Sequence, residues 1–169
     1  MYEISADSPV EMTSVPQPSL GAPCPMICAG DNSLRLAFYI EDVSPEWHGT
    51  TPRAVSESEG TEACALVSFV GPIAHMLGPP NDEAFSGHPL YSRGLRPYRA
   101  FEVHASSWIS ALEKMNAVHP GHRASLFVEY KHFIFSFHDE TFECIAWSFT
   151  ISLHRGSIPS VLLGLQMEN

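Results

Sequence analysis

The segment His132-Phe133-Ile134-Phe135-Ser136-Phe137-His138 is followed by Asp139-Glu140 and then by Thr141-Phe142-Glu143-Cys144-Ile145-Ala146-Trp147. Two runs rich in aromatic and β-branched residues, separated by a short acidic stretch, predict a β-hairpin. With Asp139 and Glu140 as the turn, His138 would lie opposite Thr141 and Ser136 opposite Glu143. A hairpin at this position favours an antiparallel sheet.

The two faces of this hairpin differ in character, because successive side chains of a strand point in opposite directions. One face is apolar throughout and is expected to join the core; it carries Phe133, Phe135, Phe137, Phe142, Cys144 and Ala146. The other face carries His132, Ile134, Ser136, His138, Thr141, Glu143, Ile145 and Trp147. A few polar groups among apolar ones are typical of the floor of a cavity.

The flanking sequence predicts further strands and one main helix. Strand patterns cover 34–41, 64–76 and 98–104, with Pro72 indicating an edge or a break in the second. Residues 106–118 predict a helix capped by Ser106 or Ser107, and a short helical turn follows at 124–130. We therefore expect an α+β fold: a mainly antiparallel sheet of about five strands with one major helix packed on it.

The domain organisation follows from the distribution of proline and polar residues. Residues 1–32 are rich in Pro and Ser and predict a disordered tail. A single α+β domain is expected over 33–157, with a long acidic loop at 44–62 and a C-terminal tail at 158–169.

The composition narrows the function classes. The formal net charge of −10 disfavours nucleic acid as a partner. No apolar run is long enough to cross a bilayer, and the first residues do not resemble a secretory signal, so we expect a cytoplasmic protein with no membrane partner. The four cysteines fit a reducing compartment and are expected to be structural or incidental. A homo-oligomer is compatible with the sequence.

The candidate catalytic pair is His138 and Glu143, which the expected hairpin places on one face within diagonal reach. A carboxylate beside an imidazole orients the ring and raises its basicity, as general acid–base catalysis requires. His132, His88 and Asp82 are auxiliary catalytic candidates. The alternative is a cross-strand salt bridge on an exposed sheet face, and a shift of register by one residue would remove the pair.

The loop at 78–90 is stiffened by two prolines and two glycines and is a good mount for functional side chains. The alternative is that its Asn and Asp side chains only satisfy turn amides. Arg93 is a candidate for holding a substrate anion, with a solvated loop as the alternative. The candidate substrate-binding residues are Asn81, Glu83, Arg93, Trp108 and Trp147.

No metal site or cofactor is predicted. His119 and His122 lie three residues apart, and His132 or His138 could supply a third ligand, but nothing in the spacing requires one. HExxH, paired CxxC, glycine-rich phosphate loops and GxSxG are absent from the sequence.

A set of motifs resembles a family of small, mostly bacterial proteins of uncharacterised function. The matching residues run over about 64–147 and comprise Pro80-Asn81-Asp82-Glu83-Ala84, Gly87-His88-Pro89-Leu90, Glu102-Val103, Ser107-Trp108-Ile109, Asn116, His132 and Phe137-His138-Asp139-Glu140-Thr141-Phe142-Glu143-Cys144. The chain departs from the pattern at Glu140, where a small hydroxyl residue is expected. The resemblance implies no activity and no residue roles.

Two hypotheses follow. The first is an enzyme that acts on a small organic substrate by hydrolysis, elimination, isomerisation or cyclisation, with His138 as acid or base and Glu143 as its orienting group. The second is a non-catalytic module that binds a ligand or a protein through the same sheet face, with Trp108, Trp147 and Tyr91 as anchors. Convergence of His138, Glu143 and His88 in one enclosed pocket would favour the enzyme.

Overall fold

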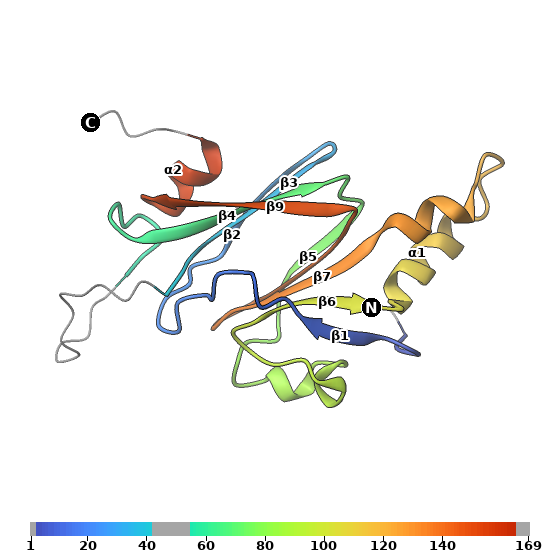
Figure 1. Cartoon of the computed structure of the whole chain (residues 1–169), viewed down its shortest axis with the longest axis horizontal. Coiled ribbons are helices and arrows are strands. Elements are labelled where there is room, and N and C mark those ends of the chain that lie inside the picture. Colours follow the sequence, from blue (N-terminus) through green and yellow to red (C-terminus); the bar gives the residue numbers. More distant parts are fainter. Residues whose placement is uncertain (1–2, 42–54, 165–169) are drawn as a thin grey trace.

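The computed structural model of the chain describes residues 3–41 and 55–164, which form two antiparallel sheets and a few short helices (Figure 1). The five-stranded sheet has the order β1-β6-β7-β8-β5 and the four-stranded sheet the order β2-β3-β4-β9. The strands are β1 Ser8–Glu11, β2 Met26–Gly30, β3 Ser33–Tyr39, β4 Ala63–Val70, β5 Ala74–Gly78, β6 Ala100–His104, β7 Lys131–Ser136, β8 Thr141–Ala146 and β9 Ser148–Arg155. The α-helices are α1 Ser107–Asn116 and α2 Ile158–Leu163, and the 3₁₀ helices are η1 Phe85–Gly87, η2 Tyr91–Arg93 and η3 Ala124–Glu129.

The main core lies between the two sheets and is dominated by phenylalanine. Phe133, Phe135 and Phe142 of the five-stranded sheet pack against Phe38 and Phe69 of the four-stranded sheet. The α+β class and the mainly antiparallel sheet are thus confirmed. The expectation of one sheet was wrong, because the apolar hairpin face is covered by a second sheet and α1 lies beyond one end of the strands.

The two sheets are joined by a bent ribbon in which each chain segment serves both sheets. β4 and β5 form one segment and β8 and β9 the other, and they stay paired through the bend: Trp147 N donates to Val70 O and Ile73 N donates to Ile145 O, both at 2.9 Å. The predicted strand over 64–76 therefore breaks near Pro72, as expected. Corners of this kind are where strands pass from one packed sheet to the other.

Gly71 makes the corner possible, so Gly71→Ala is expected to destabilise the fold. Its φ of +61° is left-handed, and a Cβ built there would lie 2.5 Å from the Trp147 ring. We expect a loss of about 1–2 kcal/mol from the backbone alone, and more from the steric clash. Urea denaturation measures this loss. Gly21→Ala is the control, because Gly21 has nothing within 4 Å of its would-be Cβ; equal loss in both variants would contradict the role assigned to Gly71.

The predicted hairpin exists, but its register differs by two residues. Ser136 pairs with Thr141 and Ile134 with Glu143, and Phe137 N donates to Glu140 O. The turn is thus centred on His138-Asp139, one residue before the predicted Asp139-Glu140. A shift of two keeps every side chain on its predicted face, so the phenylalanine face is core as expected. The opposite face is also buried rather than open to solvent.

The termini of the described chain correct two further expectations. The segment predicted to be a disordered tail contributes β1 and β2. The predicted C-terminal tail begins with α2, which covers the outer face of the four-stranded sheet through Ile158, Val161 and Leu162. The predicted acidic loop falls largely outside the described residues, as does the end of the C-terminal tail. Within the described ranges no helix is long and apolar enough to cross a membrane.

Candidate functional site

The outer face of the five-stranded sheet is covered by the loop that runs from β5 to β6. Phe85, Leu90 and Leu95 of this loop are buried against Phe101 and Ile134 of the sheet. The polar residues of that face are therefore enclosed between the sheet and the loop, in an apolar setting that strengthens their interactions.

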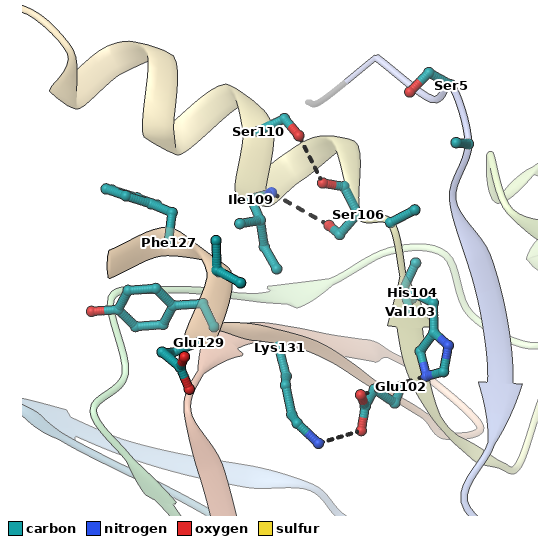
Figure 2. A pocket seen from close by; sticks show the side chains of 14 residues that line it. Ser5, Glu102, Val103, His104, Ser106, Ile109, Ser110, Phe127, Glu129 and Lys131 are labelled. Carbon is teal, nitrogen blue, oxygen red and sulfur yellow. Dashed lines mark hydrogen bonds and ion pairs between the residues drawn. The ribbon is translucent and has the colours of Figure 1, made fainter. Parts of the chain in front are cut away.

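Ser106 lies at the sharp turn between β6 and α1. The residue before it, Ala105, has a φ of +51°, in the left-handed region that is costly for a residue with a side chain. Ser106 Oγ accepts a hydrogen bond from Ile109 N at 3.3 Å and so caps the helix, as predicted (Figure 2).

Ser106 also lines a groove of about 720 Å³ at the α1 end of β6 and β7 (Figure 2). This volume lies within the range of small-molecule sites. The apolar part of its wall comes from Ile109, Phe127 and Val128. The polar part includes Ser110 and Lys131; Lys131 Nζ lies 3.1 Å from Glu102 Oε2.

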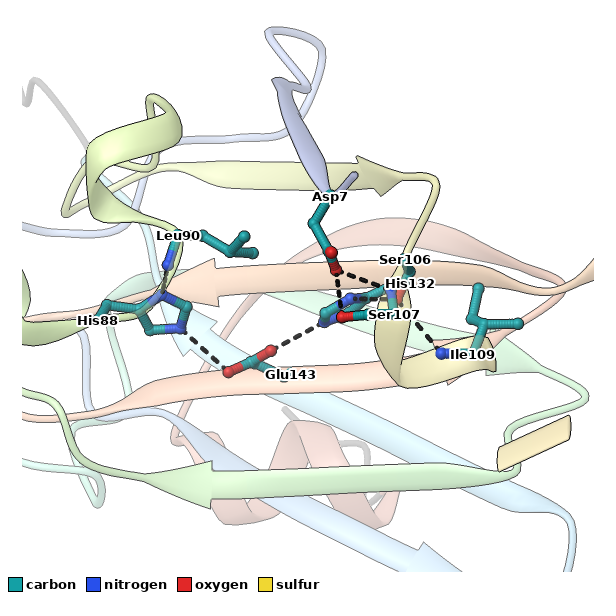
Figure 3. A network of polar contacts seen from close by, with 8 residues as sticks. All are labelled: Asp7, His88, Leu90, Ser106, Ser107, Ile109, His132 and Glu143. Carbon is teal, nitrogen blue, oxygen red and sulfur yellow. Dashed lines mark hydrogen bonds and ion pairs between the residues drawn. The ribbon is translucent and has the colours of Figure 1, made fainter. Parts of the chain in front are cut away.

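A chain of buried polar side chains runs beneath the sheet-covering loop and ends at Ser106 (Figure 3). Glu143 Oε1 lies 3.2 Å from His88 Nε2, and Glu143 Oε2 lies 2.8 Å from His132 Nε2. His132 Nδ1 lies 3.0 Å from Ser106 Oγ. Glu143 is 4% exposed, His132 0% and Ser106 5%, so the whole chain, including the serine, is largely shielded from water.

The backbone N–H of Leu90 and the carboxylate of Glu143 determine which ring nitrogens in this chain carry protons. Leu90 N donates to His88 Nδ1 at 3.1 Å, so the ring proton of His88 lies on Nε2 and is donated to Glu143. The ionised carboxylate accepts the Nε2 proton of His132. With the Nε2 proton donated to Glu143, the neutral form of the His132 ring would present its Nδ1 lone pair to the Ser106 hydroxyl. Each imidazole is thus held in one tautomer by its neighbours.

Electrostatics support the ionised form of Glu143. Burial alone raises the pKa of this carboxyl, but the hydrogen bonds from His132 and His88 outweigh burial and hold the pKa at about 2. Glu143 is therefore a carboxylate at neutral pH. A buried carboxylate beside a neutral imidazole stabilises the imidazolium that forms when the ring takes up a proton.

Asp7, which lies in the segment predicted to be a disordered tail, fixes the start of α1. Its Oδ1 accepts hydrogen bonds from Ser107 N and Ser107 Oγ, at 2.8 and 2.9 Å. Burial raises the pKa of Asp7, yet these bonds and one from Ser5 N leave the pKa below its ordinary value. The N-terminal segment is thereby held at the edge of the groove, which Ser5 and Ala6 line.

Arg93, expected to hold a substrate anion, lies on this N-terminal segment instead. Its guanidinium donates to Ser5 O at 2.8 Å and to Asp7 O at 3.0 Å. Backbone carbonyls of the chain itself therefore take the donors that an anion was expected to use.

His138 and Asp82 form a separate cluster with Tyr98, on the side of the hairpin turn. His138 Nδ1 lies 3.0 Å from Asp82 Oδ2, and Tyr98 donates to the same oxygen at 2.5 Å. Burial and the Asp82 carboxylate raise the pKa of Tyr98 to about 12, and the Tyr98 and His138 bonds lower that of Asp82. The expected His138–Glu143 pair is not formed, because the actual register places His138 beyond the end of β7.

The remaining predicted residues are dispersed. Asn81 Oδ1 accepts from Ala84 N, which is the turn role that the sequence left open, and Glu83 is exposed. Trp108 packs edge-on against the His132 ring at 5.2 Å between centroids. Trp147 is 49% exposed and stacks on Tyr130.

The histidines considered as metal ligands do not converge. His119 Nδ1 accepts from Gly121 N, and His122 Nε2 lies 2.6 Å from Glu113 Oε1. Among the residues that the structure describes, no three His, Cys, Asp or Glu side chains are placed to hold a metal ion.

Sequence reasoning thus identified three members of the buried chain, His88, His132 and Glu143, but gave Ser106 only a capping role. The signal that could have found it is the hydroxyl at a strand-to-helix turn next to the histidine-bearing strand. Asp7 carried no signal of its own. Comparisons of the chain with known protein families, with curated proteins and with solved structures gave no match, so the family resemblance stays a prediction.

Proposed function

We propose that this protein is a serine hydrolase that cleaves carboxylic esters, with Ser106 as nucleophile, His132 as general base and acid, and Glu143 as the group that orients His132. The observation that carries the proposal is the unbroken hydrogen-bonded chain from Glu143 through His132 to a hydroxyl in the wall of a groove. Nucleophile, base and orienting group within hydrogen-bond reach are the signature of nucleophilic catalysis.

In the first half-reaction, Ser106 Oγ attacks the carbonyl carbon of the ester and its proton passes to His132 Nδ1. The imidazolium that forms is stabilised by Glu143 through the Nε2–H bond. The bond between the carbonyl carbon and the leaving oxygen then breaks. His132 returns the proton to that oxygen, which releases the alcohol and leaves Ser106 acylated.

In the second half-reaction, water attacks the acyl group and His132 Nδ1 takes the water proton. The bond from the acyl carbon to Ser106 Oγ breaks, and the proton returns to the serine. The net reaction converts ester and water to carboxylic acid and alcohol and needs no cofactor. Ser110 and Lys131 line the same groove and are candidates for donors to the developing oxyanion, although Ser110 Oγ donates to Ser106 O and Lys131 Nζ to Glu102 in the structure.

The roles of the sequence candidates change in this proposal. His132, an auxiliary candidate in the sequence, becomes the general base. Glu143 orients His132 instead of His138, and His88 donates to the other oxygen of Glu143. His138 and Asp82 have no step. The substrate remains a small organic molecule, with no nucleic acid or metal involved, and the cytoplasmic location stays a prediction.

Ligand binding without turnover is the competing hypothesis. Its original form used the outer sheet face, which the β5–β6 loop covers, so a partner could reach that face only by displacing buried apolar residues such as Phe85 and Leu90. The remaining version of the binding hypothesis is a ligand that occupies the groove without being cleaved, and an experiment must distinguish it from hydrolysis.

The proposal is tested with p-nitrophenyl acetate and butyrate and with a fluorophosphonate probe. We expect steady release of p-nitrophenol above the buffer rate. We also expect one phosphonylated residue, located at Ser106 by mass spectrometry of peptides, because only an activated hydroxyl attacks the probe. Ester binding without release, together with no labelling of Ser106, would refute the hydrolase and favour the binding module.

A further inference from the structure

The segment from the second half of α1 to η3 forms an arm that projects from the sheets (Figure 1). Four apolar side chains along this arm, those of Met115, Val118, Leu126 and Val128, are between 58 and 88% exposed. Single exposed apolar residues are common on protein surfaces, but several on one projecting element indicate a surface that contacts something apolar.

The arm is continuous with the groove that contains Ser106. Phe127 and Val128 belong to η3 and also line the groove, and so does Ile109 of the adjacent helix α1. Figure 2 shows Ile109 and Phe127 in the groove. An apolar chain whose ester carbonyl lies at Ser106 would therefore leave the groove along η3. The far end of this acyl chain would cover the apolar side chains of the arm that are otherwise exposed to water.

Three charged or titratable side chains of the groove lie together at the ends of β6 and β7. Glu102, Lys131 and His104 form one linked set, with Glu102 Oε1 3.5 Å from His104 Nε2 and Glu102 Oε2 3.1 Å from Lys131 Nζ. This linked set lies on the strand side of the groove, whereas Ile109, Phe127 and Val128 lie on the side of α1 and η3, together with Ser110 and Glu129. The apolar side chains of α1 and η3 are continuous with the arm, which suits an ester with a long apolar acyl chain.

We infer that the substrate of Ser106 is an ester of a long-chain carboxylic acid, whose acyl chain lies against Phe127 and Val128 and extends over the exposed arm. This inference rests on the proposed hydrolase function. A short acyl group would fill only the part of the groove beside Ser106 and would leave the arm in water. Each additional buried methylene of a longer chain adds to binding.

The test compares kcat/KM for p-nitrophenyl laurate and p-nitrophenyl butyrate in the wild-type chain and in a Val118→Ser, Leu126→Ser double variant. Both substituted side chains are exposed, so the fold is expected to persist, and a thermal melt checks this. We expect the wild type to have a higher kcat/KM for laurate than for butyrate. In the double variant the laurate-to-butyrate ratio of kcat/KM should be about tenfold lower than in the wild type.

The matched control is Leu153→Ser, because Leu153 is similarly exposed but lies on β9 of the other sheet. The laurate-to-butyrate ratio of this variant is expected to equal that of the wild type. A ratio that falls equally in both variants would show a general effect of surface polarity and would overturn the inference.

The remaining outcomes separate the inference from the function on which it rests. Wild-type cleavage of butyrate with no preference for laurate, or an unchanged ratio in the arm variant, would overturn the long-chain substrate while the hydrolase stands. A dimeric wild type that the arm substitutions make monomeric, with the ratio unchanged, would assign the arm to a second copy of the chain and would also overturn it. No cleavage of either ester would remove the hydrolase itself.

Discussion

Ser106→Ala is expected to reduce kcat for p-nitrophenyl butyrate on the order of 10³-fold or more, because it removes the atom that forms the acyl intermediate. The fold should persist, since the loss of a helix cap costs about 1 kcal/mol. KM should change little, because the methyl group of alanine leaves the groove open. Steady-state kinetics and the fluorophosphonate probe measure both expectations.

The adjacent serine provides the matched control. Ser107 is also buried, but its hydroxyl donates to Asp7 and not to His132. Ser107→Ala should therefore retain hydrolysis and probe labelling at Ser106. His138→Asn should also retain activity, because His138 contacts Asp82 and Tyr98 rather than the buried chain. Full activity in Ser106→Ala would exclude this serine as the nucleophile.

Glu143→Leu is expected to have the largest effect on stability, a loss of about 3–5 kcal/mol at neutral pH. The Nε2–H groups of His88 and His132 would both lose their acceptor in a buried apolar setting, and each unsatisfied donor is costly. Urea denaturation measures the loss. Glu83→Leu is the control, because Glu83 is exposed, and its effect should stay within about 0.5 kcal/mol.

The pH dependence of this effect has a defined sign. The hydrogen bonds hold the pKa of Glu143 at about 2 in the folded state, against an ordinary value of 4.5. A lowered pKa of a carboxyl gives stability that is fully present above pH 4.5 and is lost as the pH falls toward 2; this difference corresponds to about 3 kcal/mol. The gap in unfolding free energy between wild type and Glu143→Leu should therefore narrow in acid. A gap that is constant over this pH window would show that the carboxylate charge is not what stabilises the fold.

The hairpin shows what the sequence could predict. Alternation of aromatic and polar residues fixes which side of a strand faces the core, so the phenylalanine face and the polar face were both identified. The register depends on where the turn lies, and the hydrogen bond between Phe137 and Glu140 centres it on His138-Asp139 rather than on the two acidic residues. Because the error was an even number of residues, it moved partners along the strand without exchanging the faces.

The buried chain could be predicted only in part, because it is assembled from four separate segments. His132 and Glu143 belong to one hairpin and their proximity follows from local pairing. His88 reaches Glu143 from the covering loop, and Ser106 meets His132 from a helix end, across 55 and 26 residues of sequence. Such contacts depend on how a loop and a helix settle on the sheet, and no local pattern encodes that arrangement.

The N-terminal segment was mispredicted because its proline content was judged by itself. Pro9 lies in β1, which forms the edge of the five-stranded sheet and, among the described strands, pairs with β6 alone. Proline lacks a backbone N–H and is tolerated at such an edge. The ordering of this segment comes from β6, from Ser107, which donates to Asp7, and from Arg93, all of which are distant in the sequence.

The bent ribbon has a mechanical consequence for the whole molecule. Since β4–β5 and β8–β9 each run through both sheets, neither sheet can unzip without pulling apart strands of the other. Local unfolding that begins in the four-stranded sheet beside α2 should therefore propagate along continuous backbone to the five-stranded sheet, where His88 and His132 are buried. The groove and the distant sheet should lose their order in a single cooperative step.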